Sequence, residues 1–416
     1  MIKTIQKNKT IILAISILVL SMLLTLLNFQ YTKSNPGGED FLINWSATRG
    51  FMTQGLSPYG SEASQSIQDE LNLHEITRTL ENPKFSMPLY GMLIFSPFAL
   101  IADFEIARAV WMTFLEISLI AIIILSMHLT YWKINPILLT SLFLFGLFGF
   151  HGIMPLLDGS LSIPITLMTL GILITIHNKQ DEAAGLMIAF TTMLPVPIGL
   201  FLIFVLVWVI ATRRGKIIAW FLATFSLLLG FSFAVIPSWL IQFLTNMIGA
   251  YRELDSASPG GILINRWGAV GERFAIGISI VIGLILVFEW WQAVKGGQKR
   301  FIWTALLTLA LGTWSGIKTS PLNYVLLYPA LIMGLELLFE RWKNKANGTI
   351  LIILVVLFLG SWSIFLLTMS ASFQTGVSSF LFIPLPITTI VLLYWSKWWV
   401  VKSNSVDLKT TLINLK

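Results

Sequence analysis

The sequence contains no cysteine and little charge. Without cysteine, the chain cannot form disulfides, use a thiolate in catalysis or bind a metal through sulfur. Charged residues make up only 11% of the 416 residues, and hydrophobic residues make up 56%. Because soluble domains contain about a quarter charged residues, this composition excludes an ordinary soluble fold. We find no internal repeat, low-complexity segment or linker, so we expect one domain over residues 1–416.

Apolar runs long enough to cross a bilayer recur along the chain, for example at 11–29, 106–131 and 350–367. Each fits the roughly 20 residues that a spanning helix needs. The first run is long and no small-residue cleavage site clearly follows it, so we expect a retained helix rather than a signal peptide. The pattern predicts an all-α, polytopic membrane protein with about ten to twelve membrane helices.

The net charge of +7 could suggest a nucleic-acid partner, but its distribution follows membrane topology instead. Basic residues gather at the chain start and in short loops, which the positive-inside rule assigns to the cytoplasm. We therefore expect no nucleic-acid partner and a multi-pass protein of the cell membrane with both termini cytoplasmic. The basic residues are Lys3, Lys7, Lys9, Arg213, Arg214, Lys216, Lys295, Lys299, Arg300, Arg341, Lys343 and Lys345.

Two longer segments are rich in acids and are expected on the outer face, at residues 31–105 and 237–273. The first is too charged to enter lipid, and its mixed polar and apolar stretches predict short interfacial helices. Between Lys179 and Arg213, an apolar stretch is interrupted near Pro195. Since both basic ends are assigned inside, we expect two short helices that meet at the prolines.

The acids Glu39 and Asp40 follow closely after the first predicted helix. A carboxylate there would lie at the boundary of water and lipid, where it could accept a proton from a hydroxyl that attacks a sugar. Most surface acids are simply solvated, so spacing alone favours that simpler interpretation. Both carboxylates could also bind a divalent ion loosely, but no ligand spacing predicts a protein-liganded metal or another cofactor.

Several motifs resemble glycosyltransferase family 87, the polyprenol-phosphate-mannose-dependent mannosyltransferase group of the GT-C superfamily. The opening motifs are Asp40-Phe41, Trp45-Ser46-Ala47 and Gly55-Leu56-Ser57-Pro58-Tyr59. A second block contains Phe85-Ser86-Met87-Pro88-Leu89, Ser96-Pro97-Phe98-Ala99-Leu100 and Ala107-Arg108-Ala109-Val110-Trp111. Weaker similarities are Gly159-Ser160-Leu161-Ser162, Ala184-Gly185 with Pro195 and Pro197, Asn265-Arg266, and Ser320-Pro321.

The resemblance implies a membrane enzyme that moves a hexose, mannose in the first instance, from a polyprenyl-phosphate donor to a glycolipid or glycan acceptor. Transfer would invert the anomeric centre on the outer face, with Asp40 as general base and Glu39, Asn265 and Tyr324 in support. Because the departing phosphate is anionic, it needs a nearby cation. Outer-face candidates are Arg266, Lys318, Arg252, Arg273, Lys84 and Arg108, and we favour the first two for their positions in the motifs.

Two departures from the family pattern bear on activity. Leu194-Pro195 stands where a Lys-Pro pair is common, which bears on donor phosphate binding. Leu322-Asn323-Tyr324 stands where an aromatic residue and a histidine follow the Ser-Pro pair, which leaves that active-site histidine unaccounted for. One alternative is therefore a family member without catalysis. From another class, a transporter or flippase of lipid-linked sugars would share the helix count and the broken helices.

Three other features have simpler interpretations than a catalytic role. Glu116 falls inside a predicted helix, where an acid is either functional or a hydrogen-bonding partner in helix packing. His151 is isolated and matches no metal motif. Trp290 and Trp291 lie near a predicted helix end, where we expect them to anchor the chain at the membrane interface.

Overall fold

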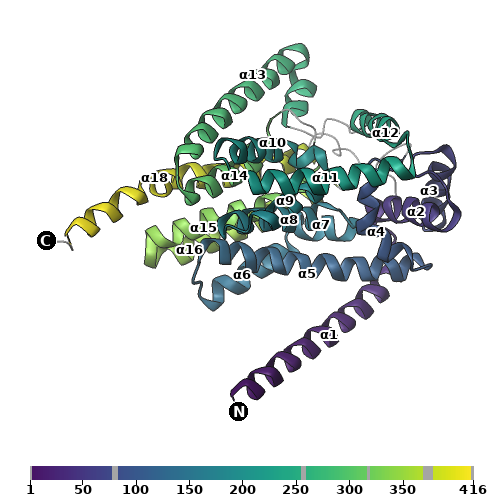
Figure 1. Cartoon of the computed structure of the whole chain (residues 1–416), viewed down its shortest axis with the longest axis horizontal. Helices are drawn as coiled ribbons and strands as arrows, with labels where there is room; N and C mark the ends of the chain where they lie inside the picture. The colour runs from purple at the N-terminus through teal and green to yellow at the C-terminus, as the bar shows by residue number, and fades with distance from the viewer. Residues whose placement is uncertain (1, 77–82, 254–258, 316–318, 369–377, 414–416) are drawn as a thin grey trace. The chain divides into compact units, whose positions relative to one another are not determined.

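The computed structural model describes the chain except residues 1, 77–82, 254–258, 316–318, 369–377 and 414–416 (Figure 1). The described residues are mainly helical and contain no strand, which confirms the predicted all-α fold. Within them, eight helices are long and apolar enough to cross a membrane. That number is below the expected ten to twelve because three apolar segments form shorter helices, at Leu89–Ala99, Ser162–His177 and Pro195–Ala211.

The chain divides into two compact units. The first comprises Met1–Ile117, Leu156–Ser160 and Ser238–Ala250, and the second comprises Ser118–Pro155, Leu161–Pro237 and Tyr251–Lys416. The expectation of one domain with outer loops at 31–105 and 237–273 stays a prediction.

The first unit contains short helices in the segment predicted as the first outer loop. Its elements are α1 (Ile2–Ser34), α2 (Glu39–Gln54), α3 (Ser61–Leu73), η1 (Leu89–Gly91), α4 (Met92–Ala99), the beginning of α5 (Phe104–Thr130) and most of α12 (Trp239–Glu253). Helices α2 and α3 agree with the short helices expected there. Helix α12 lies in the second predicted outer loop, which is therefore largely helical.

A polar network in the first unit joins α1 to α5. The Asn28 side-chain amide donates hydrogen bonds to Glu116 Oε2 at 3.0 Å and to Thr113 Oγ1 at 3.1 Å. Asn28 is buried and Glu116 is half-buried. Of the two interpretations of Glu116, these contacts favour the role in helix packing.

The second unit holds most of the apolar helices. Its elements are the rest of α5, α6 (Pro136–Phe148), most of α7 (Phe150–Asp158), α8 (Ser162–His177), α9 (Asp181–Thr191), α10 (Pro195–Ala211), α11 (Gly215–Val235), α13 (Pro259–Lys295), α14 (Gln298–Gly312), η2 (Pro321–Leu327), α15 (Tyr328–Trp342), η3 (Lys343–Lys345), α16 (Ala346–Thr368), η4 (Ser378–Phe382) and α18 (Pro384–Ile413). Helices α9 and α10 are the two expected short helices, with Pro195 at the first position of α10.

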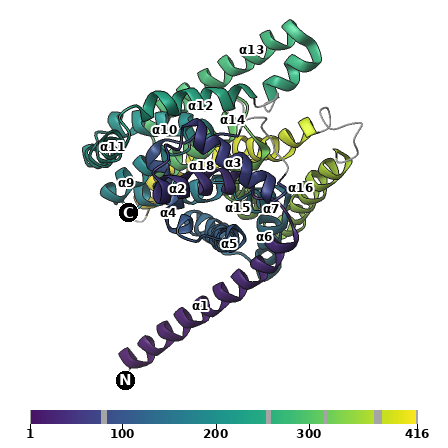
Figure 2. The same ribbon diagram turned by 90° about the vertical axis from the view of Figure 1, so that its right-hand side faces the viewer.

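Close packing and one buried charge cluster hold the second unit together. Helix α9 lies directly against α11, because a side-chain carbon added at Gly185 would be only 2.5 Å from the Ile217 carbonyl oxygen (Figure 2). In α13, Glu289 is 2% exposed and forms ion pairs with Arg300 of α14 and Lys397 of α18. These pairs join three helices around one buried carboxylate.

Large apolar side chains on several helices are exposed, as expected where lipid is the solvent. Leu227 on α11 is 74% exposed, and Ile352 on α16 is 64% exposed. The predicted interfacial role is wrong for Trp290, which is buried and donates a hydrogen bond to Thr308 Oγ1 at 2.8 Å. Its neighbour Trp291 is exposed, as an interfacial anchor should be.

Candidate active site

Glu39 and Asp40 occupy the first turn of α2, where the helix dipole favours negative charge. The chain enters this helix through Gly38, which has the left-handed angle φ of 83°. Glu39 is buried, whereas Asp40 is half-buried and can be reached from outside. The Asn44 amide donates to Asp40 Oδ1 at 3.1 Å and to the Asp40 carbonyl oxygen at 2.7 Å. Asp40 is therefore an accessible carboxylate that a neighbouring amide orients.

Arg108 of α5 lies beneath this turn and is 2% exposed. Its guanidinium donates to the carbonyl oxygens of Asn35 at 2.8 Å and Leu157 at 3.2 Å. The side chain passes so close to the turn that a Cβ at Gly38 would be 2.7 Å from Arg108 Nε. The Arg108 guanidinium thus joins the turn before α2 to the end of α7. Because the side chain runs against the backbone at Gly38, that position requires glycine.

Asp158, the last residue of α7, completes the cluster. The backbone amide of Asp40 donates a hydrogen bond to the Asp158 carboxylate, which also experiences repulsion from Asp40 and Glu39 and attraction from Arg108. Of these three carboxylates, Asp158 is the one that the Arg108 guanidinium attracts. No predicted site residue lay at Asp158; the available signal was an aspartate that ends an apolar run directly before Gly159.

An aromatic cluster fixes the two aspartates. The Phe41 ring stacks on Trp111 with centroids 5.5 Å apart, and the Trp111 indole N–H donates to the Gly159 carbonyl oxygen at 2.9 Å. Gly159 has φ of 75°, and a Cβ there would be 2.4 Å from Phe41 Cβ. Because Phe41 follows Asp40 and Gly159 follows Asp158, this packing positions both carboxylates.

Other residues of the family-like motifs also form the scaffold. The Trp45 indole donates to the Phe98 carbonyl oxygen at 3.1 Å, which joins α2 to α4. The Tyr59 hydroxyl donates to the Met87 carbonyl oxygen at 2.7 Å, so two separate motifs meet. Burial raises the pKa of Tyr59 well above its ordinary value, and the phenol remains a neutral donor. These aromatic residues support the site rather than enter it.

The model of glycosyltransferase family 87 matches residues 85–315, which is more than half of the chain. The chain belongs to this family. The matched region contains Arg108 and Asp158, and it begins after Asp40 and ends before Ser320-Pro321. No curated protein and no solved structure shows significant similarity to the chain. Family membership, together with the eight apolar helices, makes the protein a membrane glycosyltransferase.

The other predicted site residues of this family 87 glycosyltransferase lie outside the first unit. Arg266 is on α13, and its side chain is exposed. Tyr324 is fully buried in η2, where its ring packs edge-on against Phe382. Lys318 and the side chains of Arg252 and Asn265 lie outside the described residues. Of the predicted site residues that the structure describes, Glu39 and Asp40 are thus brought together, and they are joined by Arg108, which was a less favoured candidate, and by Asp158.

A histidine lies beside the Ser-Pro segment of the glycosyltransferase although none follows it in sequence. His151 of α7 is buried, donates through Nδ1 to the Pro321 carbonyl oxygen at 3.0 Å, and has its ring 5.4 Å from that of Tyr324. Across the described part of the chain, no group of three or more histidine or acidic side chains is arranged to hold a metal ion. The absence of a metal or another cofactor stays a prediction.

Proposed function

We propose that this membrane glycosyltransferase is of the GT-C type and transfers a hexose from a polyprenyl-phosphate donor to an acceptor glycolipid or glycan on the outer face of the membrane. Mannose is the first sugar to test, because the motifs resemble mannosyltransferases. The observation that carries the proposal is the half-buried Asp40 carboxylate, which Asn44 orients at the start of α2 beside Asp158.

In the proposed reaction, Asp40 accepts the proton of an acceptor hydroxyl. The acceptor oxygen then forms a bond to the anomeric carbon while the bond from that carbon to the phosphate oxygen breaks. Polyprenyl phosphate departs with the electron pair, and attack from the opposite face inverts the configuration. General-base catalysis of this kind contributes roughly 10²- to 10⁴-fold to a rate.

The geometry supports Asp40 over its neighbours as the base. Glu39 is buried, and the Asp158 carboxylate already accepts the Asp40 amide. Arg108 is enclosed and directs both terminal nitrogens to backbone carbonyls, so its charge attracts Asp158 rather than meeting the donor. In the proposal, the donor phosphate therefore requires other cations, for which Arg266, Lys318 and Arg252 are the candidates and Arg266 is exposed.

The test is sugar transfer by purified protein from polyprenyl-phosphate mannose and other polyprenyl-phosphate hexoses to extracted membrane glycolipids. We expect Asp40→Asn to lower turnover by at least about 100-fold, because the amide cannot accept the proton. Asp69→Asn is the matched control, since Asp69 is an exposed acid of α3. NMR of the product gives the anomeric configuration.

Turnover by Asp40→Asn equal to that of the unchanged protein would remove Asp40 from the mechanism. Retained configuration would exclude a single displacement. If no hexose is transferred, reconstituted vesicles distinguish the alternatives. Movement of a labelled lipid-linked sugar between leaflets would identify a flippase, and donor binding without movement would identify an inactive family member.

A further inference from the structure

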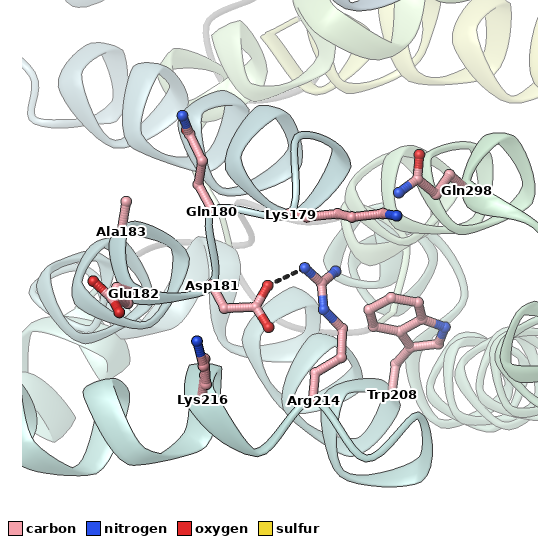
Figure 3. Close-up of a pocket in the computed structure, with 9 residues that line it drawn as sticks. All are labelled: Lys179, Gln180, Asp181, Glu182, Ala183, Trp208, Arg214, Lys216 and Gln298. Atoms are coloured by element: carbon pink, nitrogen blue, oxygen red, sulfur yellow. Dashed lines mark hydrogen bonds and ion pairs between the residues drawn. The ribbon is translucent and has the colours of Figure 1, made fainter.

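The second unit contains a pocket of about 800 Å³ that the glycosyltransfer reaction does not use (Figure 3). Among the residues that line it are Lys179, Arg214, Lys216, Asp181, Gln298 and Trp208. They come from the ends of α9, α10, α11 and α14 and from the turn that joins α8 to α9. The pocket is open, and most of its lining side chains are polar or charged.

Three helices begin at this pocket. Helices α9, α11 and α14 start at Asp181, Gly215 and Gln298, and none of the three has a side chain that caps its first amides. The first amides of a helix lack backbone acceptors and carry the positive end of the helix dipole. The first-turn acids Asp181 and Glu182 offset the positive end of α9, so the starts of α11 and α14 are the two ends suited to an anion such as phosphate.

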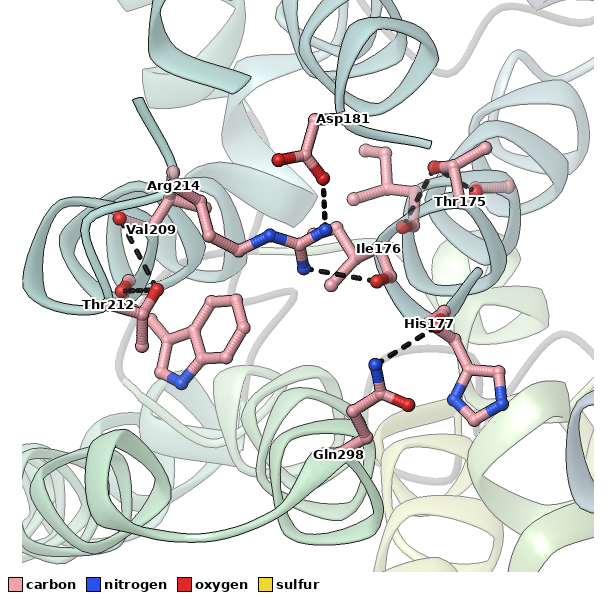
Figure 4. Close-up of polar contacts among 11 residues, drawn as sticks. Thr175, Ile176, His177, Asp181, Val209, Thr212, Arg214 and Gln298 are labelled. Carbon is pink, nitrogen blue, oxygen red and sulfur yellow. Dashed lines mark hydrogen bonds and ion pairs between the residues drawn. The ribbon is translucent and has the colours of Figure 1, made fainter. Parts of the chain in front are cut away.

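The charged side chains divide into a fixed pair and two free lysines. Arg214 forms an ion pair with Asp181 and donates to the Ile176 carbonyl oxygen at 3.0 Å (Figure 4). Its charge is therefore balanced and its position set. Within the described part of the chain, the side-chain ammonium groups of Lys179 and Lys216 make no hydrogen bond or ion pair. They outnumber the exposed acid Glu182, so the lining retains positive charge.

The framework of the pocket is rigid. The close approach of α9 to α11 at Gly185 fixes the starts of both helices next to each other. The Gln298 amide donates to the His177 carbonyl oxygen at 3.0 Å, which holds the start of α14 against the end of α8 (Figure 4). An anion would therefore meet a preformed site and lose little binding energy to its ordering.

The surroundings of the pocket favour a lipid over a soluble anion. On α10, Val207 and Ile210 flank the lining residue Trp208 and are 55% and 64% exposed. On α11, Trp220 lies one helical turn after Lys216 and is 44% exposed. Exposed apolar side chains on membrane helices contact acyl chains. Lysines beside such a surface keep their charge at the headgroup level.

We propose that this pocket binds the phosphate of an anionic phospholipid, with Lys179 and Lys216 as its ligands and the acyl chains along α10 and α11. The lipid would hold the ends of these helices together at the membrane surface. Because residues of the second unit form the pocket and residues of the first form the Asp40 cluster, the proposal is independent of the sugar donor.

The test is native mass spectrometry of the full-length protein with phosphatidylglycerol and with phosphatidylcholine of the same acyl chains. We expect preferential retention of phosphatidylglycerol, and at least about tenfold weaker binding of it by the double variant Lys179→Gln/Lys216→Gln, since two charge-assisted contacts are lost. Lys343→Gln/Lys345→Gln removes the same charge from η3 and should leave binding unchanged. Lys179→Arg/Lys216→Arg keeps the charge and should retain binding.

Equal loss of phosphatidylglycerol in both glutamine double variants would overturn the proposal, because the effect would then follow net charge alone. Equal retention of both lipids by the unchanged protein would also overturn it. Inorganic phosphate that binds as tightly as phosphatidylglycerol would assign the pocket to a soluble phosphate instead. If the first double variant does not fold, the single variants Lys179→Gln and Lys216→Gln replace it, and unchanged binding of phosphatidylglycerol by both would count against the two lysines.

Discussion

The indole N–H of Trp111 donates a hydrogen bond to the carbonyl oxygen of Gly159 at 2.9 Å. This bond joins α5 to the residue that follows Asp158, while the same ring stacks on Phe41, the residue that follows Asp40. One side chain therefore positions the two aspartates of the candidate site from behind.

Trp111→Phe should keep the stacking on Phe41 but leave the Gly159 carbonyl oxygen buried without its donor. Such a loss costs about 1–3 kcal/mol, and the smaller ring adds a cavity. We expect a lower free energy of unfolding and slower sugar transfer. Trp220→Phe is the control, because Trp220 is 44% exposed and a surface substitution changes stability by only about 0.5 kcal/mol. Thermal unfolding in detergent compares the stability of the two variants. Equal shifts of their melting temperatures would contradict the role of Trp111 in positioning the aspartates.

Gly38→Ala should disturb the start of α2. Gly38 has φ of 83°, and the added carbon would lie 2.7 Å from Arg108 Nε. The left-handed conformation alone costs a side chain about 1–2 kcal/mol. Gly50→Ala is the matched control on the same helix, since its nearest new contact would be 3.6 Å away. We expect Gly50→Ala to be neutral or stabilising by about 0.5–1 kcal/mol. Similar melting temperatures for the two variants would refute the prediction.

Glu289→Gln should destabilise the second unit strongly. The substitution keeps the shape but removes the negative charge between Arg300 and Lys397, and breaking a buried pair from one side costs about 3–5 kcal/mol. Glu272→Gln, an exposed position on the same helix, should have little effect. Chemical unfolding in detergent tests the difference. An unchanged midpoint for Glu289→Gln would mean that the three helices do not depend on this cluster.

Asn28→Ala should loosen the attachment of α1 to α5. It removes the donor to both Glu116 and Thr113, and hydrogen bonds to charged groups contribute about 1.5–3 kcal/mol. Gln30→Ala is a suitable control because Gln30 is exposed on the same helix. Protease accessibility of the first helix should rise in Asn28→Ala only. Identical cleavage of the two variants would show that the network does not hold the helix.

The sequence was informative where local pattern decides the structure. Long apolar runs located α5 and α16, and Pro195 marked the junction of α9 and α10 because proline can begin a helix but not continue one. The segment 237–273 was expected to be an outer loop, yet it contains α12 and the start of α13. Its glycines and mixed polarity hide a helical pattern from single-sequence inspection.

Two residues of the candidate site were predicted from the sequence, and the pairing of Arg108 with Asp158 was not. Asp40 was found because its motif resembles a family, and Glu39 because it adjoins Asp40. Arg108 and Asp158 are fifty residues apart in the chain, and no spacing rule joins an arginine inside one helix to an aspartate at the end of another. Their meeting is a property of tertiary packing. Trp290 was misjudged for the same reason, since its position near a helix end does not tell which face the ring occupies.

The position of Asp158 at the end of α7 makes it electrostatically dependent on Arg108. The last turn of a helix presents unpaired carbonyl oxygens and the negative end of the dipole, so a carboxylate there is disfavoured. Arg108 compensates by donating to Leu157 and by attracting the Asp158 charge. Substituting the arginine alone should thus be more harmful than neutralising both residues together. Across family 87, we expect these two positions to covary, so that a protein in which one of them is substituted also has a substitution at the other.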